Sequence, residues 1–145
     1  MDTTRLAAQT LTQRITAAVR TVDGLALPVP AELSYCSGDP YAVTISFLLG
    51  EGPVPWIFGR DLLAGGLAEP TGDGDVHVWP CVNDEGDQVV TIELCSLDGD
   101  ALVELRTEDA AAFLRRTHTA VAPGAEPAHL DFDALVTALL GAGNA

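Results

Sequence analysis

The chain has 145 residues, of which 48% are hydrophobic, and its formal net charge at pH 7 is −14. This length predicts a single domain over residues 1–145, since a compact domain takes about 100–200 residues. The negative charge disfavours nucleic acid and anionic lipid as partners, because Lys and Arg supply the attraction to both. All of the basic residues are arginine, a composition typical of GC-rich genomes.

Nothing in the sequence indicates secretion or membrane insertion. The first 20 residues contain Asp2 and three arginines and lack the apolar core of a signal peptide. No stretch approaches the ~20 apolar residues that span a bilayer. The three cysteines contain no CxxC pair, which favours reduced thiols over a disulfide framework. We therefore expect a cytoplasmic protein without a transmembrane segment.

Residues 11–59 are predicted to form strands. Residues 11–22 alternate imperfectly and indicate a long strand, with a helix as the alternative. Pro28 and Pro30 then impose an extended backbone that suits an edge strand or the entry to a strand. Residues 39–49 show the clearest alternation of period two in the chain. After the turn Gly50-Glu51-Gly52, the sequence PVPWIF is expected to return as the second strand of a hairpin.

Residues 60–141 are predicted to contain three helices and three further strands. A short helix begins at GRDLLAGGL, with Asp61 in its first turn and Gly65-Gly66 ending it. Strands follow over residues 76–79, 87–97 and 100–106, the last two joined through Asp98-Gly99. Thr107 is the expected N-cap of a long helix, and a terminal helix is expected from Asp131 until Gly141.

This order of elements predicts an α+β fold. Runs of strands followed by helices favour mainly antiparallel pairing. The order also suggests two similar halves, each a small sheet followed by a helix, with a C-terminal helix at the end.

The loop PTGDGDVHVWP, residues 70–80, combines glycines and aspartates that could bind a phosphate, bind a cation or form a turn. A phosphate loop would place a lysine or a helix N-terminus behind its glycines, whereas this segment carries Asp73 and Asp75 and leads into a strand. A calcium loop counted from Asp73 would need glycine at its sixth position, where Val78 stands. A turn leading into a strand is therefore the favoured structure, with a role in partner contact as the alternative.

Catalytic and metal-binding patterns are weak. Zinc could be held by a set drawn from His77, Cys81, Cys95 and Cys36, but their spacing matches no closed structural motif. No G-x-S-x-G elbow is present, and Cys36 has no histidine near it in the sequence. We therefore expect no enzyme activity, no cofactor and no metal.

Candidate partner contacts lie in the middle of the chain. Large aromatic residues often anchor interfaces, although a tryptophan in a strand is more often half-buried core. Arg60-Asp61 at a helix start could recognise a partner if exposed, or could form a cap and an ion pair. The candidate partner-binding residues are Trp56, Arg60, Asp61, Asp75 and Trp79.

Four segments resemble the SsgA-like proteins of sporulating actinomycetes. They read LPVPAELSY, DPYAV, WIFGRDLLAGGLAEPTGDGDVHVWP and AFLRRTHTAVAPGAE, and the resemblance runs from about Leu25 to Leu140. It implies an α/β fold similar to the whirly and mitochondrial RNA-binding proteins, assembled as a homotrimer. The segment ahead of Leu25 is longer than the start expected of the SsgB type, the best-studied branch of that family.

The resemblance also implies a function. It predicts a regulator without enzymatic activity that acts at the sporulation septum, where the SsgB type recruits the tubulin-like division protein FtsZ. A scaffold for division proteins is thus the first hypothesis. A single-stranded nucleic-acid binder is the second and would require the arginines to gather on one face. A small-molecule or zinc-binding enzyme is the third.

Overall fold

The computed structural model describes residues 8–21, 23–97, 99–130 and 139–140. Within them, eight strands form one sheet in the order β4-β3-β2-β1-β8-β7-β6-β5, and each recorded strand pair is antiparallel. The elements in chain order are β1 (Thr10–Arg20), β2 (Ala26–Cys36), β3 (Ala42–Leu49), β4 (Gly52–Gly59), α1 (Arg60–Gly66), β5 (Thr71–Asp73), β6 (Val76–Val82), β7 (Gln88–Ser96), β8 (Gly99–Arg106), α2 (Thr107–Ala120) and the 3-10 helix Glu126–His129.

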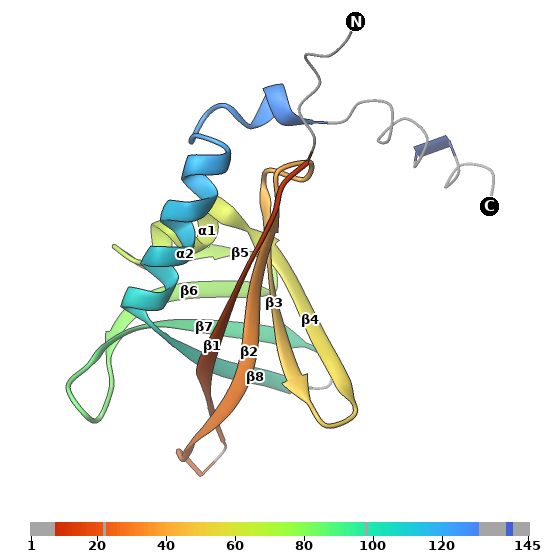
Figure 1. The fold of residues 1–145 in the computed structure, drawn as a ribbon. Helices are drawn as coiled ribbons and strands as arrows, with labels where there is room; N and C mark the ends of the chain where they lie inside the picture. The colour runs from red at the N-terminus through yellow and green to blue at the C-terminus, as the bar shows by residue number, and fades with distance from the viewer. Residues whose placement is uncertain (1–7, 22, 98, 131–138, 141–145) are drawn as a thin grey trace, which may run out of the picture.

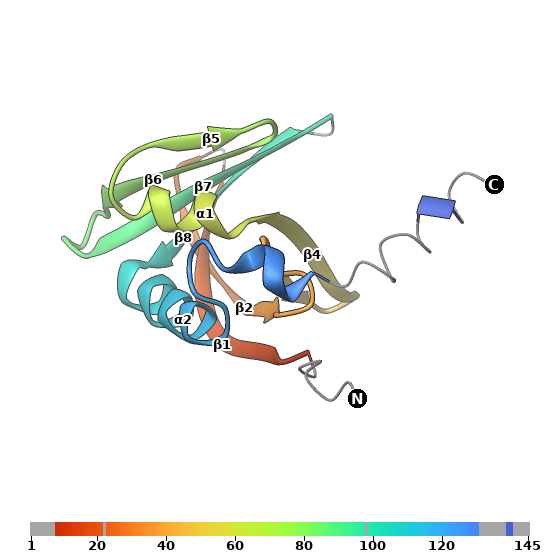
Figure 2. The same ribbon diagram turned by 90° about the horizontal axis from the view of Figure 1, so that it is seen from above.

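The chain consists of two halves with the same order of elements. Four strands and α1 form the first half, and four strands and α2 form the second. The halves join where β1 pairs with β8 over three residue pairs, and the two groups of strands run nearly crosswise to each other (Figure 1). Seen from above, both helices lie on the inner side of this bend (Figure 2). The predicted α+β fold with two sheet-plus-helix halves is confirmed, although the two sheets are continuous.

The core fills the inner side of the bent sheet. On β3, the side chains of Val43, Ile45 and Phe47 are buried there, as the alternation of period two predicts. Phe113 and Leu114 of α2 pack against the same cluster. Burial of these apolar side chains against both helices is the main stabilising contribution to the fold.

The prolines lie where neighbouring strands do not need their N–H groups. Pro28 and Pro30 belong to β2, which is an internal strand and not the edge strand considered above. However, β3 pairs with β2 only over residues 31–34, so both prolines have β1 on one side and an open position on the other. Pro53 and Pro55 lie on β4, at the edge of the sheet, where missing N–H groups discourage pairing with another chain.

The other predicted elements largely agree with the structure. Residues 70–80 form a turn as predicted, and they add a short strand, β5, that pairs with β6. The strand predicted over 76–79 extends to Val82. Arg106, and not Thr107, occupies the N-cap of α2, and no side chain makes a capping hydrogen bond there. The helix predicted from Asp131 falls outside the described residues apart from positions 139–140.

Candidate functional site

Arg60 forms a buried polar cluster at the junction of both helices. Its side chain is 1% exposed, and Nη2 donates to Glu126 Oε2 at 2.6 Å. Nη1 donates to the carbonyl oxygens of Thr117 and Val121 at the end of α2, at 3.1 and 2.7 Å. A cation at a helix C-terminus is favoured by the helix dipole. Arg60 therefore ties the start of α1 to the end of α2 and to the 3-10 helix.

One more side chain, that of Tyr35, completes this cluster. The guanidinium carbon of Arg60 lies 5.2 Å from the centre of the Tyr35 ring, within range of a cation–π interaction. The hydroxyl of Tyr35 donates to the carbonyl of Pro40 at 2.9 Å. Burial raises the pKa of Tyr35, and the charge of Arg60 opposes that shift. Arg60 Nε has no hydrogen-bond partner among the described residues.

The cluster also changes the titration of its acidic and imidazole members. Hydrogen bonds from the backbone and from Arg60 lower the pKa of Glu126 below its ordinary value. One of these backbone bonds is donated by Gly124 N–H to Glu126 Oε1 at 2.8 Å. Burial and the nearby charge of Arg60 lower the pKa of His118. Arg60 contributes to both shifts, second to the backbone hydrogen bond at Glu126 and to burial at His118.

The five candidate partner residues do not form one patch. Arg60 is buried, so its guanidinium is not a surface contact, and it pairs with Glu126 and not with Asp61, which is exposed. Trp56 lies opposite Ile45 and packs against the core on the inner side. Trp79 follows Val78, a buried core residue, and therefore points to the outer face, where Asp75 is exposed at the hairpin turn.

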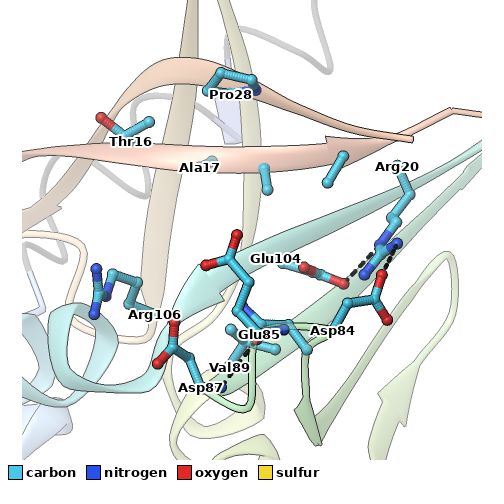
Figure 3. Close-up of a pocket in the computed structure, with 13 residues that line it drawn as sticks. Thr16, Ala17, Arg20, Pro28, Asp84, Glu85, Asp87, Val89, Glu104 and Arg106 are labelled. Carbon is cyan, nitrogen blue, oxygen red and sulfur yellow. Dashed lines mark hydrogen bonds and ion pairs between the residues drawn. The ribbon is translucent and has the colours of Figure 1, made fainter. Parts of the chain in front are cut away.

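A groove of about 380 Å³ opens where the β6–β7 loop approaches β1 and β2 (Figure 3). The loop supplies the carboxylates of Asp84, Glu85 and Asp87, and Thr16 and Pro28 line the opposite wall. Turn hydrogen bonds hold the loop: Asn83 Oδ1 accepts from the backbone N–H groups of residues 85 and 87, both at 2.9 Å. The loop side of the groove is thus held by turn hydrogen bonds and carries three carboxylates.

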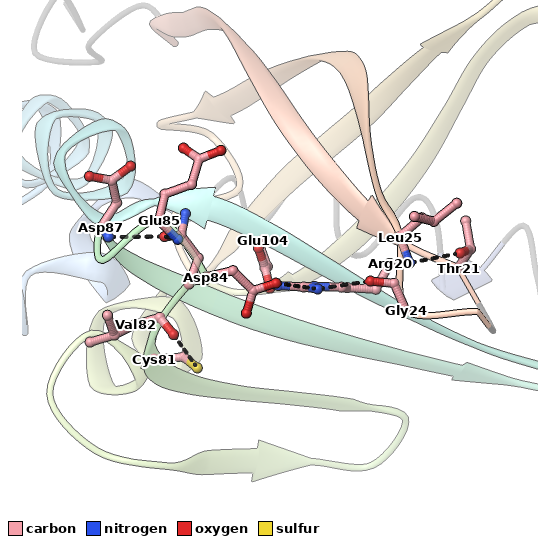
Figure 4. Close-up of polar contacts among 11 residues, drawn as sticks. Arg20, Thr21, Gly24, Leu25, Cys81, Val82, Asp84, Glu85, Asp87 and Glu104 are labelled. Carbon is pink, nitrogen blue, oxygen red and sulfur yellow. Dashed lines mark hydrogen bonds and ion pairs between the residues drawn. The ribbon is translucent and has the colours of Figure 1, made fainter.

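Arg20 closes one end of the groove. It donates to Glu104 Oε2 through Nε at 2.9 Å, lies 3.5 Å from Asp84 Oδ2, and donates to the carbonyl of Gly24 at 3.0 Å (Figure 4). The hydrogen bond to Glu104 raises the pKa of Arg20 above its ordinary value. Two of the three guanidinium nitrogens of Arg20, Nε and Nη1, are therefore engaged by the protein itself.

The histidine and cysteine candidates separate into distinct places. His77 lies beside Glu93 and Cys95, and one ligand atom from each of the three falls within 4.8 Å of the others. Cys81 is exposed, and Cys36 lies on β2 in the other half. Neither belongs to this group, so the four-residue zinc set considered from the sequence is not brought together. Glu93 was missed because only the β6–β7 register reveals it opposite His77.

The described arginines do not gather on one uninterrupted basic face. Arg60 is buried, Arg20 is bound by two carboxylates, and Arg14 pairs with Glu32 at 3.2 Å. Arg106 shares one depression with Arg115 and another with Arg14, and acidic residues 108 and 109 lie in both. Arg116 donates to the carbonyl of Thr12. A continuous track of positive charge for a phosphate backbone is therefore not found in the described part of the chain. No helix there is long and apolar enough to cross a membrane.

Residues 29–126 match the sequence model of a family described as "Streptomyces sporulation and cell division protein, SsgA". The sporulation-specific cell division protein SsgB of Streptomyces coelicolor is 52% identical over 108 residues, which cover 74% of this chain and 78% of that protein. The SsgB of Kineococcus radiotolerans is 46% identical over 123 residues, covering 84% and 74% of the two chains.

Two solved structures share the fold. One, described by the words "Mutations in SsgB correlate to longitudinal cell division during sporulation of Streptomyces coelicolor", gives a TM-score of 0.80 at 44% identity and covers 85% of this chain and 97% of that one. An SsgA-like sporulation-specific cell division protein from Thermobifida fusca gives 0.80 at 34% identity, covering 90% and 95%. The chain belongs to the SsgA family of sporulation and cell division proteins.

Proposed function

We propose that this protein is a non-catalytic scaffold of sporulation-specific cell division, which recruits or positions the FtsZ ring at the septum from the cytoplasm. The observation that carries the proposal is family membership: seven relatives named as sporulation-specific cell division proteins are 37–52% identical. The choice of FtsZ as partner follows from the family resemblance, because the SsgB type of that family recruits FtsZ.

The charge of the molecule supports a protein partner over a nucleic acid. The net charge is −14, and the groove beside the β6–β7 loop exposes carboxylates while its two arginines lie among them. A phosphate backbone would be repelled by such a surface, whereas a polypeptide with basic residues would be attracted.

The candidate contacts define two separate surfaces. Trp79 and Asp75 belong to the β5–β6 hairpin, on the outer side of the sheet. Asp61 lies at the start of α1, next in the chain to β4, which carries the half-buried Trp56. We place the partner on the hairpin surface, because Trp79 points away from the core while Trp56 packs against it. Arg60 then acts indirectly, by fixing the helices.

We further propose that the chain assembles as a homotrimer. The family resemblance supplies the number of subunits, and the β3–β4 hairpin supplies a surface that such an assembly would cover. Leu49 and Val54 are 49% and 41% exposed on the face of this hairpin that carries Phe47, and Ile57 is 65% exposed on the opposite face. Large apolar side chains that are exposed in a single chain favour association. Light scattering on the purified protein measures the number of subunits directly.

The decisive experiment is co-sedimentation of the purified protein with FtsZ polymers from the same organism. It should be repeated at several ionic strengths, with a labelled single-stranded oligonucleotide as the competing ligand. Co-sedimentation without oligonucleotide binding supports the scaffold. Binding of the oligonucleotide without co-sedimentation would overturn the scaffold in favour of the nucleic-acid hypothesis.

Point variants then map the surface. Trp79→Ala is expected to weaken co-sedimentation, and Asp75→Asn to weaken it less. Val82→Ala is the matched control, because Val82 lies on β6 like Trp79 and is 61% exposed. Equal co-sedimentation of folded Trp79→Ala and Val82→Ala proteins would remove the hairpin surface and direct mapping to Asp61 and Trp56.

A further inference from the structure

Three side chains of different chemistry converge on the outer face of the second half. His77 on β6 stands directly opposite Glu93 on β7, and Cys95 follows two residues later on the same side of β7. One ligand atom from each lies within 4.8 Å of the others. Imidazole nitrogen, carboxylate oxygen and thiolate sulfur are the three donor types that zinc takes from proteins.

The distance between the imidazole and the carboxylate fits two ligands of one metal ion. His77 Nδ1 lies 3.4 Å from Glu93 Oε1, longer than a strong hydrogen bond. Two N or O ligands of a tetrahedral zinc ion with bonds of about 2.0–2.1 Å are separated by roughly 3.3–3.4 Å. The His77 and Glu93 ligand atoms thus already have the separation of two ligands in such a shell. A third donor, the Cys95 sulfur, lies beside them.

The orientation of His77 is fixed by its neighbour on β5. Gly72 pairs with His77, and a Cβ atom built on this glycine would lie 2.5 Å from His77 Cδ2 and 3.2 Å from Nε2. The imidazole therefore lies against the backbone of Gly72, in space that any other residue would fill. This glycine is an observation independent of the ligand cluster, and it leaves room for the ring at this position.

Further negative charge surrounds the group. Asp100 lies opposite Cys95 in the β7–β8 pair, and the backbone N–H of Cys95 donates to the carbonyl of Asp75 at 2.8 Å. Both aspartates are exposed, and they would add to the attraction for a cation. A water molecule or one of these carboxylates could complete four-fold coordination, which leaves the ion accessible from solvent.

We propose that His77, Glu93 and Cys95 form a site for a divalent transition-metal ion, with zinc as the best match to the mixed N, O and S donors. On binding, the Cys95 sulfur forms a bond to the ion and its proton passes to solvent. The ion links β6 to β7 on the outer face of the sheet. This inference stands independently of the proposed role at the division septum.

The site is tested on the full-length protein, first stripped of metal with a chelator. Cobalt(II) is the probe, because a Co–thiolate bond gives an absorption band that reports the sulfur ligand. We expect one equivalent of cobalt to bind and zinc to displace it. Wild type without a thiolate band, or with a band that zinc leaves unchanged, would overturn the proposal.

Variants identify the ligands. Cys95→Ser should abolish the cobalt–thiolate band, and His77→Gln and Glu93→Gln should weaken binding at least about tenfold. Cys81→Ser is the matched control, since Cys81 is an exposed cysteine on the strand that carries His77, and it should bind as wild type. A band that survives in Cys95→Ser or disappears in Cys81→Ser would refute the assignment, and unchanged affinity in Glu93→Gln would refute the three-ligand site.

Stability gives a second readout. A ligand that binds only the folded state raises the unfolding temperature by mass action. Zinc should therefore raise the thermal midpoint of wild type and of Cys81→Ser, and leave that of Cys95→Ser unchanged. Because His77 and Glu93 retain 46% and 32% side-chain exposure on the outer face, these substitutions spare the core, and circular dichroism verifies the fold. An equal rise in Cys95→Ser would contradict the site.

Discussion

Two arginine–glutamate pairs in this protein have similar chemistry and different surroundings. Arg60 and Glu126 have side chains that are 1% and 6% exposed, whereas Arg20 and Glu104 are 22% and 10% exposed. The Arg60 pair lies at the helix junction, and the Arg20 pair closes one end of a surface groove. Burial decides how much each pair matters, because water screens the second pair and not the first.

The comparison also separates two kinds of contribution to function. Arg60 connects elements that are distant in the sequence, the start of α1, the end of α2 and the 3-10 helix. It therefore sets the positions of Asp61 and of both helices without meeting a partner. Arg20 shapes the groove wall between β1, β8 and the β6–β7 loop. Changes at Arg60 should act on the whole fold, and changes at Arg20 should act locally.

The largest effect is expected from Arg60→Met. Removing this cation leaves Glu126 buried without its guanidinium partner and takes one donor from the carbonyls of Thr117 and Val121, of which Thr117 keeps the N–H of Val121. We expect a loss of about 3–5 kcal/mol in the free energy of unfolding, measured by urea denaturation. Arg60→Met combined with Glu126→Leu should recover most of this loss, because a buried pair can be replaced by apolar residues of similar size. A double variant as unstable as the single one would contradict this account.

Glu126→Gln should have a smaller effect that depends on pH. The carboxylate pKa is lowered in the folded state from its ordinary value of 4.5, so its stabilisation is complete above that value and is lost as the pH falls through the folded-state pKa. The difference in unfolding free energy between wild type and Glu126→Gln should therefore be constant near neutral pH and shrink in acid. Urea denaturation across this range measures it, and a difference that grows in acid would reverse the assigned sign.

Arg20→Gln should lower the thermal midpoint less than Arg60→Met does. The pKa of Arg20 is raised above its ordinary value, so its stabilisation is complete throughout the neutral range and no pH dependence is expected there. Salt should reduce the effect, because the partly exposed pair is screened. Asp84→Asn is the matched control, since the Asp84 side chain is 90% exposed. Equal losses in thermal midpoint for Arg20→Gln and Asp84→Asn would show that the contact of Arg20 with Glu104 adds nothing to stability.

Elements set by neighbouring residues could be predicted from the sequence, whereas contacts between distant residues could not. Alternation over residues 39–49 and the turn Gly50-Glu51-Gly52 predicted the β3–β4 hairpin, because these signals are local. The sequence did not decide whether Arg60 is buried or exposed, because its partner Glu126 is 66 residues away. Register between strands is likewise non-local, which is why His77 and Cys95 were considered while Glu93 was not. Pairing across the sheet decides which polar residues meet.

The smallest effect is expected from Arg14→Gln, which tests the most exposed of the three arginine–glutamate pairs. Arg14 pairs with Glu32 across β1 and β2 at 3.2 Å, with side chains 72% and 33% exposed. The geometry resembles that of Arg20 with Glu104, but solvent screens this pair more strongly. We expect the free energy of unfolding to change by less than about 0.5 kcal/mol in urea denaturation. A loss as large as that of Arg20→Gln would mean that β-strand pairing, and not burial, determines the strength of these ion pairs.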